Sequence, residues 1–321
     1  MNYFLYQLQF NTAVHFGASD SALSLHHSQM HFRADTLFSA LCHTVLQLDG
    51  EAGLNRLVQL ASGGALLLSD SMPWEEDRFY LPKPIYAPQA VAEIPGEKRK
   101  ALKKLVWIPV EAFPDFCAAL RTGAFVDIPA TAFGTEVDAV KAAVPETEDT
   151  LPYPVGLYRF FDGRGLYFLL GCEDQADGEW LASRIRALGL GGIGGKTSAG
   201  FGKFEVKKAT FLNKSGDAQA QWLYRALTTP APRSMLLTSS LPRDDELDAA
   251  MQDACYQLVR RAGIVASNAL PEGTRKKQTQ YFFSAGSVLA SRFTGDVYQV
   301  GPRNTHPVYR YAKPIFLGVA L

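Results

Sequence analysis

A run of glycines lies between a predicted helix and a predicted strand, and this order limits what the chain can fold into. Seven of the fourteen residues from Gly189 to Gly202 are glycine, with Lys196-Thr197-Ser198 among them. Residues 179–188 have the apolar spacing of a helix that Gly189 would end. Residues 201–211 alternate apolar and polar side chains, as a strand does. The sequence therefore predicts a helix, a glycine loop and a strand, in that order.

This order argues against two familiar nucleotide motifs. Gly189, Gly191 and Gly194 match G-x-G-x-x-G, and Gly195-Lys196-Thr197 resembles the end of a phosphate-binding P-loop. Both motifs need a strand before the glycines and a helix after them, because the helix N-terminus holds the phosphate. The P-loop also fails on spacing, since Leu190 stands where its first glycine belongs.

The glycine loop is better suited to a sugar-phosphate backbone. Glycines let a main chain approach a ligand closely, and their N–H groups can bond phosphate oxygens. Lysine and hydroxyl side chains would add a charge and hydrogen-bond donors, and such contacts hold a strand without reading its sequence. The alternative is a flexible surface turn. The candidate RNA ligands of this segment are Gly191, Gly192, Gly194, Gly195, Lys196, Thr197, Ser198 and Lys203.

Composition restricts the class of protein. The 321 residues carry 32 Lys plus Arg and 32 Asp plus Glu, so any polyanion site must be local. With 47% hydrophobic residues the chain can bury a sizeable core. Its four cysteines lack C-x-x-C spacing, which fits a reduced chain without a zinc site. The first residues lack a basic signal region, and no apolar run reaches membrane length. We expect a soluble, cytoplasmic protein.

The first part of the chain predicts the order β-α-β-β-α-β. Its expected elements are a strand at 3–10, a helix at 36–48, a strand at 64–68, a hairpin of 155–161 with 165–170, the helix at 179–188 and the strand at 201–211. The hairpin would turn at Asp162-Gly163. This is the order of the ferredoxin-like unit that also underlies RNA-recognition folds. Residues 70–154, Pro-rich and irregular, are interpreted as a long insertion.

A second unit is expected from residue 213. Its elements would be a strand at 235–239, a helix at 244–254 and strands at 256–259, 278–283, 296–300 and 314–319. Leu247, Met251 and Ala254 would face inward. The predicted fold is α+β, with two tandem ferredoxin-like domains at 1–212 and 213–321.

Other residues could contact RNA. Arg33 precedes the helix at 36–48, whose N-terminus suits a phosphate, and Asp35 is the expected N-cap. Arg33 could equally be a solvated side chain. Five of the six histidines fall within the first 43 residues. They could be general acid–base groups, metal ligands or plain polar contacts, although few carboxylates lie near enough to complete a metal site. We expect no metal and no cofactor.

Two basic segments add further candidates. The C-terminal stretch 301–311 interleaves cations with aromatic residues, a composition suited to stacking bases and binding phosphates, with Arg303, His306 and Arg310 as candidate ligands. Tyr309 and Tyr311 could equally be half-buried strand residues. The basic run 98–104 is either a solvated face or an arm against RNA or a neighbouring subunit.

Four stretches, taken together, resemble a known family. They are Phe32-Arg33-Ala34-Asp35-Thr36-Leu37-Phe38-Ser39-Ala40-Leu41, then Leu81-Pro82-Lys83-Pro84 with Lys104-Leu105-Val106-Trp107-Ile108-Pro109, the glycine loop from Gly191 to Gly202, and His306-Pro307-Val308-Tyr309-Arg310-Tyr311. They resemble the RAMP superfamily of CRISPR proteins and, within it, the fourth subunit of the type III-A Csm effector complex. The glycine loop alone marks only the superfamily.

The resemblance implies a role in antiviral defence without catalysis. It implies two ferredoxin-like domains, binding of the 5′ handle of the crRNA, and contacts with the large polymerase-like subunit and the first backbone subunit. Carried over, RNA contacts would fall on Arg33, Ser39, the loop around Lys196 to Ser198 and the tail from His306 to Arg310. One segment departs from the family, since residues 135–150 are mainly acidic where relatives often carry an arginine-rich turn. That segment could face a protein partner instead.

Two other functions stay open at this stage. One is a RAMP endoribonuclease that processes precursor crRNA, with a histidine such as His15 or His27 as general base. The other is the equivalent subunit of a type III-B Cmr complex. We expect a non-catalytic scaffold in preference to both.

Overall fold

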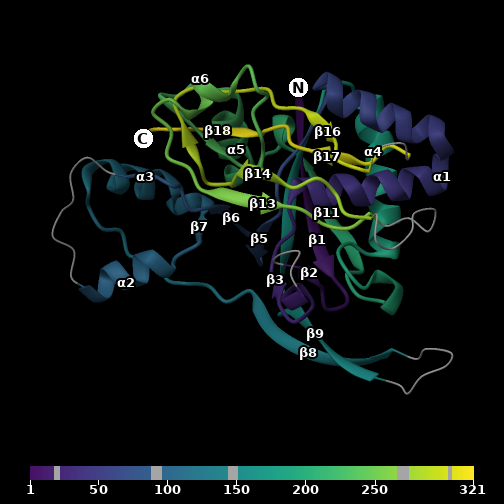
Figure 1. Cartoon of the computed structure of the whole chain (residues 1–321). Helices are drawn as coiled ribbons and strands as arrows, with labels where there is room; N and C mark the ends of the chain where they lie inside the picture. The colour runs from purple at the N-terminus through teal and green to yellow at the C-terminus, as the bar shows by residue number, and fades with distance from the viewer. Residues whose placement is uncertain (18–21, 88–95, 144–150, 266–274, 303–305) are drawn as a thin grey trace.

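The protein is a mixed α/β fold built on antiparallel sheets (Figure 1). The computed structural model describes residues 1–17, 22–87, 96–143, 151–265, 275–302 and 306–321. A seven-stranded sheet lies at the centre, in the order β11-β1-β10-β5-β6-β7, with β4 also paired to β10. Its strands are β1 (Asn2–Phe10), β4 (Leu66–Leu68), β5 (Met72–Glu75), β6 (Arg78–Pro82), β7 (Trp107–Pro109), β10 (Arg164–Cys172) and β11 (Phe204–Phe211). The expected strands at 3–10, 64–68 and 201–211 are confirmed within a few residues.

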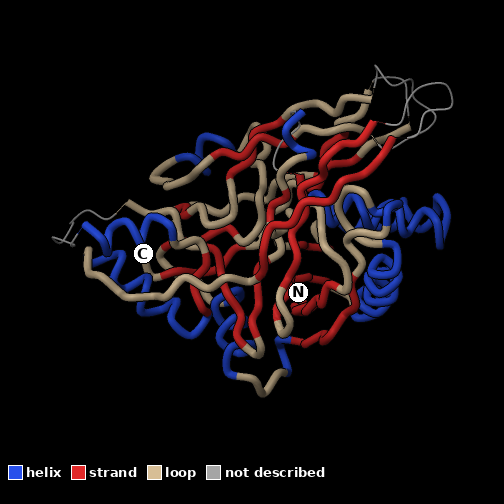
Figure 2. The backbone as a smooth tube through the Cα atoms, turned by 90° about the horizontal axis from the view of Figure 1, so that it is seen from below, coloured by secondary structure: helices blue, strands red, loops and turns tan. Residues whose placement is uncertain are grey.

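The two faces of the central sheet are both buried, and alternation along β10 explains how. Leu166, Phe168 and Leu170 belong to one core cluster, which α1 (Ala34–Gly63) and α4 (Gln175–Gly191) cover. Tyr167 and Leu169 belong to a second cluster on the other face. Successive side chains of a strand point to opposite faces, so one strand serves both cores. Figure 2 shows strands running through the middle of the molecule with helices on both sides.

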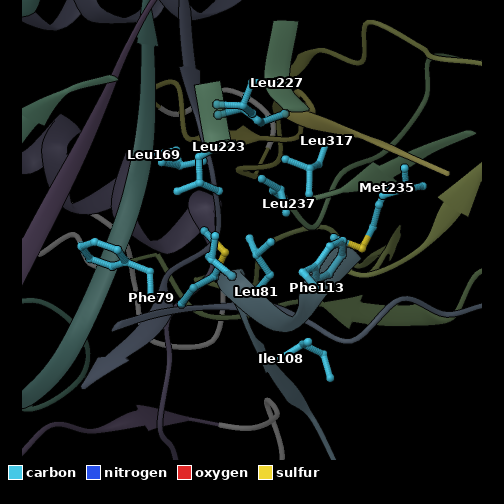
Figure 3. Packing of buried hydrophobic residues seen from close by; sticks show 14 of the residues in the cluster. Phe79, Leu81, Ile108, Phe113, Leu169, Leu223, Leu227, Met235, Leu237 and Leu317 are labelled. Carbon is cyan, nitrogen blue, oxygen red and sulfur yellow. The ribbon is translucent and has the colours of Figure 1, made fainter. Parts of the chain in front are cut away.

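The second core joins the two halves of the chain. Leu169 of β10 and Leu81 of β6 pack with Leu223 of α5 (Ala218–Thr228), Met235 of β12 (Arg233–Leu236) and Leu317 of β18 (Phe316–Val319) (Figure 3). Burying each such side chain contributes roughly 1.5–3 kcal/mol. The halves on either side of residue 213 therefore share a core, and the boundary itself stays a prediction.

The other elements form smaller sheets and short helices around this centre. The three-stranded sheet has the order β15-β12-β18, and the pairs are β2 with β3, β8 with β9, β13 with β14 and β16 with β17. These strands are β2 (Phe16–Gly17), β3 (Ser28–Gln29), β8 (Gly134–Ala143), β9 (Leu151–Phe160), β13 (Leu258–Arg261), β14 (Gln280–Phe283), β15 (Val288–Leu289), β16 (Val297–Gln299) and β17 (Tyr309–Tyr311). Among the described residues, the remaining α-helices are α2 (Gly96–Lys104), α3 (Phe113–Thr122) and α6 (Leu247–Met251), and 3₁₀ turns lie at 22–25, 110–112, 197–199 and 212–214.

The predicted hairpin of 155–161 with 165–170 is wrong in its pairing. Both strands exist, as β9 and β10, and Gly163 turns between them with φ of 70°. However, β10 pairs with β1 and with β4 and β5, so both of its edges are occupied. β9 pairs instead with β8 along its whole length, and the two form an arm that projects from the body of the molecule (Figure 1).

The expected irregular insertion at 70–154 contains regular structure. β5, β6 and β7 extend the central sheet, and Trp74, Tyr80 and Phe113 in or beside them are buried. These strands contain prolines or end at them, and for this reason the sequence did not predict them as strands. Residues 88–95 and 144–150 lie outside the described part of the chain, and so do the acidic residues Glu146, Glu148 and Asp149.

Three predicted helix details are also wrong: the N-cap of α1, the inward face of α6 and the C-terminal end of α4. Asp35 does not cap α1, because Arg33 is the N-cap residue and Asp35 is already helical. The acceptor comes instead from Asp70, whose Oδ1 receives a hydrogen bond from the Ala34 N–H at 2.9 Å. In α6 the predicted inward residues Leu247 and Met251 are exposed, while Ala250 is buried.

Helix α4 runs past Gly189 and ends at the C-cap Gly192, which has φ of 90°. Gly189 is needed for another reason, since a Cβ there would lie 2.3 Å from the Phe204 carbonyl oxygen of β11. Helix α1 breaks at Gly50, where φ of 67° and ψ of −161° are open to glycine alone. This break turns the second half of α1 relative to its first half.

Candidate nucleic-acid interface

A cleft of about 500 Å³ lies between the start of α1, the segment around β2, the glycine loop and the C-terminal strands. Five predicted RNA ligands line it, although they come from three distant parts of the sequence: Arg33, Ser39, Gly194, Gly195 and Arg310. The fold therefore brings three of the four family-like stretches to one place. The stretches around residues 81–84 and 104–109 do not line this cleft.

Positive charge concentrates in this cleft. Arg33, Arg261, Lys277 and Arg310 line it, and Asp35 is the one carboxylate among its lining residues. The Arg261 guanidinium binds Asp35 with two hydrogen bonds, Nε to Oδ2 at 2.8 Å and Nη2 to Oδ1 at 2.7 Å. Asp70, buried beside the start of α1, also interacts with Arg33 and Arg261. Four cations against two carboxylates leave a local excess of positive charge, although the whole chain has no net charge.

The pKa is lowered for three of the four cations, Arg33, Lys277 and Arg310, whereas Arg261, despite its burial, has its pKa held above the ordinary value by Asp35. Burial lowers the pKa of Arg33, and Arg261 lowers it further. Burial also lowers the pKa of Lys277, with Arg310 and Arg261 adding repulsion. Burial of Asp35 opposes its charge, yet Arg261, Arg310 and Arg33 together hold its pKa below the ordinary value. Each cation would be better stabilised if an anion entered the cleft.

Arg310 is 3% exposed, so it takes part in the architecture of the cleft wall. Its Nη1 donates to the carbonyls of Arg261 and Gln278 at 3.0 and 2.7 Å, and its Nη2 donates to the carbonyl of Ala262 at 3.3 Å. These bonds tie β17 to the segments that continue β13 and β14. The sequence analysis named Arg310 as a candidate RNA ligand. Its side chain lines the cleft but is bonded to these carbonyls, and an RNA contact there stays a prediction.

The glycine loop is bonded to the protein through several of its own amides. The Gly195 N–H donates to the carbonyl of His15 at 2.8 Å, and the Gly202 N–H donates to that of Ala13 at 2.9 Å. Across the loop, the Ile193 N–H donates to the Gly202 carbonyl at 2.9 Å. The sequence prediction assumed free amides, whereas these three hold the loop against the segment before β2.

Close packing explains several of these glycines. A Cβ at Gly202 would lie 2.1 Å from the Ile193 oxygen, and one at Gly194 would lie 2.6 Å from the His15 oxygen. Gly192 has the same problem with the Phe201 oxygen at 2.7 Å. The main chain that approaches these glycines most closely is thus that of the protein itself, in the loop and at His15.

The remaining loop candidates spread outward from the cleft. Lys196 has φ of 61°, and its Nζ donates to the Tyr153 hydroxyl of β9 at 3.3 Å while lying over that ring. Thr197 is half-buried, and Ser198 and Lys203 are exposed. Lys196 therefore faces the β8–β9 arm, at the edge of the site.

The tail candidates divide in a different way. His306 is exposed and lines a second cavity of about 350 Å³ that adjoins the cleft. Arg303 lies outside the described residues. Tyr309 is half-buried and Tyr311 fully buried, as the alternative interpretation of this tail proposed, and the Tyr311 hydroxyl accepts a hydrogen bond from the Leu68 N–H at 2.9 Å.

Sequence reasoning missed Arg261 and Lys277. Arg261 follows an ordinary arginine, and its importance comes from a carboxylate 226 residues away in sequence. Lys277 stands in a short basic stretch with no motif. Sequence reasoning also missed that His31 is neutral. Burial together with Arg33 and Arg261 lowers the pKa of His31 to about 3.

The histidines do not assemble a metal site in the described part of the chain, where no group of three or more His, Cys, Asp or Glu side chains could hold a metal ion. His15 lines the cleft, and its Nδ1 donates to the Gly156 carbonyl at 2.7 Å. Cys42, Cys117, Cys172 and Cys255 are all free thiols. No helix among the described residues is long and apolar enough to cross a membrane.

Comparison with known proteins shows the family. The model of the CRISPR Csm4 C-terminal domain matches residues 229–319. The CRISPR system Cms protein Csm4 of Mycobacterium tuberculosis (strain CDC 1551 / Oshkosh) is 32% identical over 320 residues, which cover 99% of this chain and 98% of the relative. The chain belongs to the Csm4 family. Csm4 of Streptococcus thermophilus is 31% identical and covers 98% of both chains.

Solved structures agree with this fold. A chain in the crystal structure of a Csm1–Csm4 cassette in complex with cA4 matches with a TM-score of 0.63 at 21% identity, over 100% of this chain and 99% of the other. A chain in the Csm3–Csm4 subcomplex of a type III-A CRISPR-Cas interference complex matches with a TM-score of 0.62 at 16% identity, over 100% of both chains. At these identities the likeness concerns the fold.

Proposed function

We propose that this Csm4-family chain is a non-catalytic scaffold subunit of a type III-A Csm effector complex and that its cationic cleft holds the 5′ handle of the crRNA. One observation carries the proposal, namely that four cations meet in one cleft with only Asp35 and Asp70 among the described residues to balance them, so that an RNA phosphate would offset their mutual repulsion. A phosphodiester meets that need without demanding catalysis.

The partners follow from the family. Relatives of the same fold are found with Csm1 and with Csm3, and we propose that this chain likewise joins a large subunit to a backbone subunit. We also propose that its first half is one ferredoxin-like unit. The strand order β11-β1-β10-β4, with α1 and α4 on one face, supports that assignment. The three-stranded sheet of the second half would be the centre of a more degenerate unit.

Lys277 provides the sharpest test of the cleft. Within the described part of the chain its side chain has no hydrogen-bond or ion-pair partner, and its main-chain N–H donates to the Gly263 carbonyl. Because Asp35 is paired with Arg261, Lys277→Gln removes a charge without stranding a carboxylate. In filter-binding titrations with repeat-derived RNA, we expect the variant to bind about tenfold more weakly and to show a salt slope smaller by about 0.7. Lys208→Gln, on an exposed position of β11, is the matched control and should bind as the wild type does. Equal affinity of the Lys277 variant and the control would contradict the assignment.

The endoribonuclease remains the second candidate, because His15 lines the cleft. Incubation of the purified protein with repeat RNA distinguishes the two functions. The scaffold leaves the RNA intact, whereas metal-independent cleavage that disappears in His15→Ala would favour the nuclease. The large subunit that co-purifies with the chain separates a type III-A complex from a type III-B complex.

A further inference from the structure

The cavity that adjoins the cleft has the chemistry of a nucleobase site. It shares Ser39, His43, Lys277 and Tyr309 with the cleft, so the two spaces meet at these four residues. The cleft is cationic, whereas the cavity beyond the junction has no arginine in its lining. Its volume of about 350 Å³ lies within the range of small-ligand pockets.

Apolar side chains form most of the inner wall. They are Leu46 and Leu54 of α1, Val265 after β13, and Pro307 and Val308 before β17. Leu46 is 42% exposed, so its side chain is accessible to a ligand in the cavity. The half-buried Tyr309 adds an aromatic ring to this wall.

Polar groups also line the cavity, and they come from both sides of the break in α1. Ser39 and His43 come from the first half of the helix, and Glu51 and Asn55 come from the second half. Gly50 makes this possible, because its non-helical backbone lets both halves of α1 contribute to one cavity. An amide can both donate to and accept from a base edge, and a carboxylate accepts from an exocyclic amino group.

We propose that one base of the bound RNA leaves the stack and inserts into this cavity while its phosphate stays in the cleft at Lys277. This inference rests on the proposed function and gives the same site a base-binding part. The apolar wall would contact the faces of the base, and Glu51 and Asn55 would favour a base with an exocyclic amino group over uracil. A site made only for phosphates would need no such cavity.

The test combines abasic RNAs with two matched tryptophan variants. Leu46→Trp fills the cavity from an exposed position of α1. Leu48→Trp places the same side chain on the same helix at a 57% exposed position that does not line the cavity. Full-length protein is titrated with repeat-derived RNA and with a series in which one base at a time is removed.

We expect removal of one particular base to weaken binding by the wild type about tenfold, the usual size of one base contact. Leu46→Trp should bind intact RNA about tenfold more weakly and lose its sensitivity to that base, with the salt slope unchanged. Leu48→Trp should behave as the wild type does. Replacement of that base by uracil should weaken binding by the wild type and not by Glu51→Ala.

Two results overturn the inference while leaving the RNA site in place. One is a series in which no single abasic position costs more than about twofold. The other is an abasic cost that persists in Leu46→Trp. If the wild-type protein does not bind RNA, or if its affinity does not depend on salt, the proposed function is refuted, and the base site with it.

Discussion

The glycine loop and the charged network around Asp35 both form walls of the same cleft, yet they are built on different principles. The loop is a local object, in which neighbouring glycines permit main-chain contacts at positive φ. The network is long-range, since Asp35, Arg261 and Arg310 meet only in the finished fold. The loop supplies shape with little charge, whereas the network supplies charge on a buried frame. A motif search finds the first kind of wall and overlooks the second.

The largest effect should come from breaking the network. Asp35→Ala leaves Arg261 and Arg310 buried without their carboxylate, and we expect a loss of about 3–5 kcal/mol in the free energy of unfolding by urea. Glu111→Ala, which removes the partner of Arg78 from an exposed ion pair, is the control and should cost less than about 1 kcal/mol. Similar losses in both variants would show that burial of the network does not matter.

A smaller loss should follow from changing the loop. Gly202→Ala combines φ of 77° with a contact of 2.1 Å to the Ile193 oxygen, and we expect it to cost about 2–3 kcal/mol. Thermal or urea unfolding measures this loss. The control is Gly191→Ala, because nothing lies within 4 Å of a Cβ there and the residue is helical. If Gly202→Ala is as stable as that control, the loop is not packed as described.

Next in size is the effect of the loop on RNA. Lys196→Glu should weaken binding of handle RNA about five- to tenfold and reduce the salt slope by about 1, because one phosphate contact is lost. A filter-binding titration over several salt concentrations measures both quantities. Unchanged affinity would mean that Lys196, which faces β9, plays no part in the site and that the cationic wall binds the RNA without it.

The smallest effect concerns acid. The pKa of Asp35 is lower in the folded protein, so its stabilising contribution is complete above the unfolded value near 4 and is lost as pH falls through the folded value. The free energy of unfolding should therefore fall less steeply with acid in Asp35→Asn than in the wild type. Asp70, whose pKa burial raises, acts in the opposite direction in both proteins and cancels in the comparison. Equal slopes would contradict the assigned direction.

The sequence predicted much of the central sheet because its signals are local. Alternation marked β1 and β11, and helical spacing marked α4 and the first half of α1. Pairing was harder to predict, as the hairpin shows, since the partner of β9 depends on which strands already occupy the edges of β10. The N-cap of α1 was predicted wrongly for the same reason, because the acceptor is Asp70, 36 residues away from Ala34 in the sequence.

The sequence predicted several residues that line the cleft, but not most of its charged residues. Arg33, Ser39 and the glycines stood in recognisable stretches, and the fold brings them to one cleft. Arg261 and Lys277 had no such context, so only the three-dimensional arrangement reveals them. Arg310 was chosen because of the composition of the stretch 301–311, and composition gives no information on the burial of a side chain. Its side chain turned out to bind carbonyls inside the protein.

The bonds from Arg261 and Arg310 back to the start of α1 also set an order of events during synthesis. The first wall of the cleft leaves the ribosome early, with residues 15–39, whereas the opposing cations arrive only with β13 and β17. A nascent chain that still lacks its last sixty or so residues cannot close this cleft. If the cleft holds RNA as proposed, a truncated chain would lack the complete binding site.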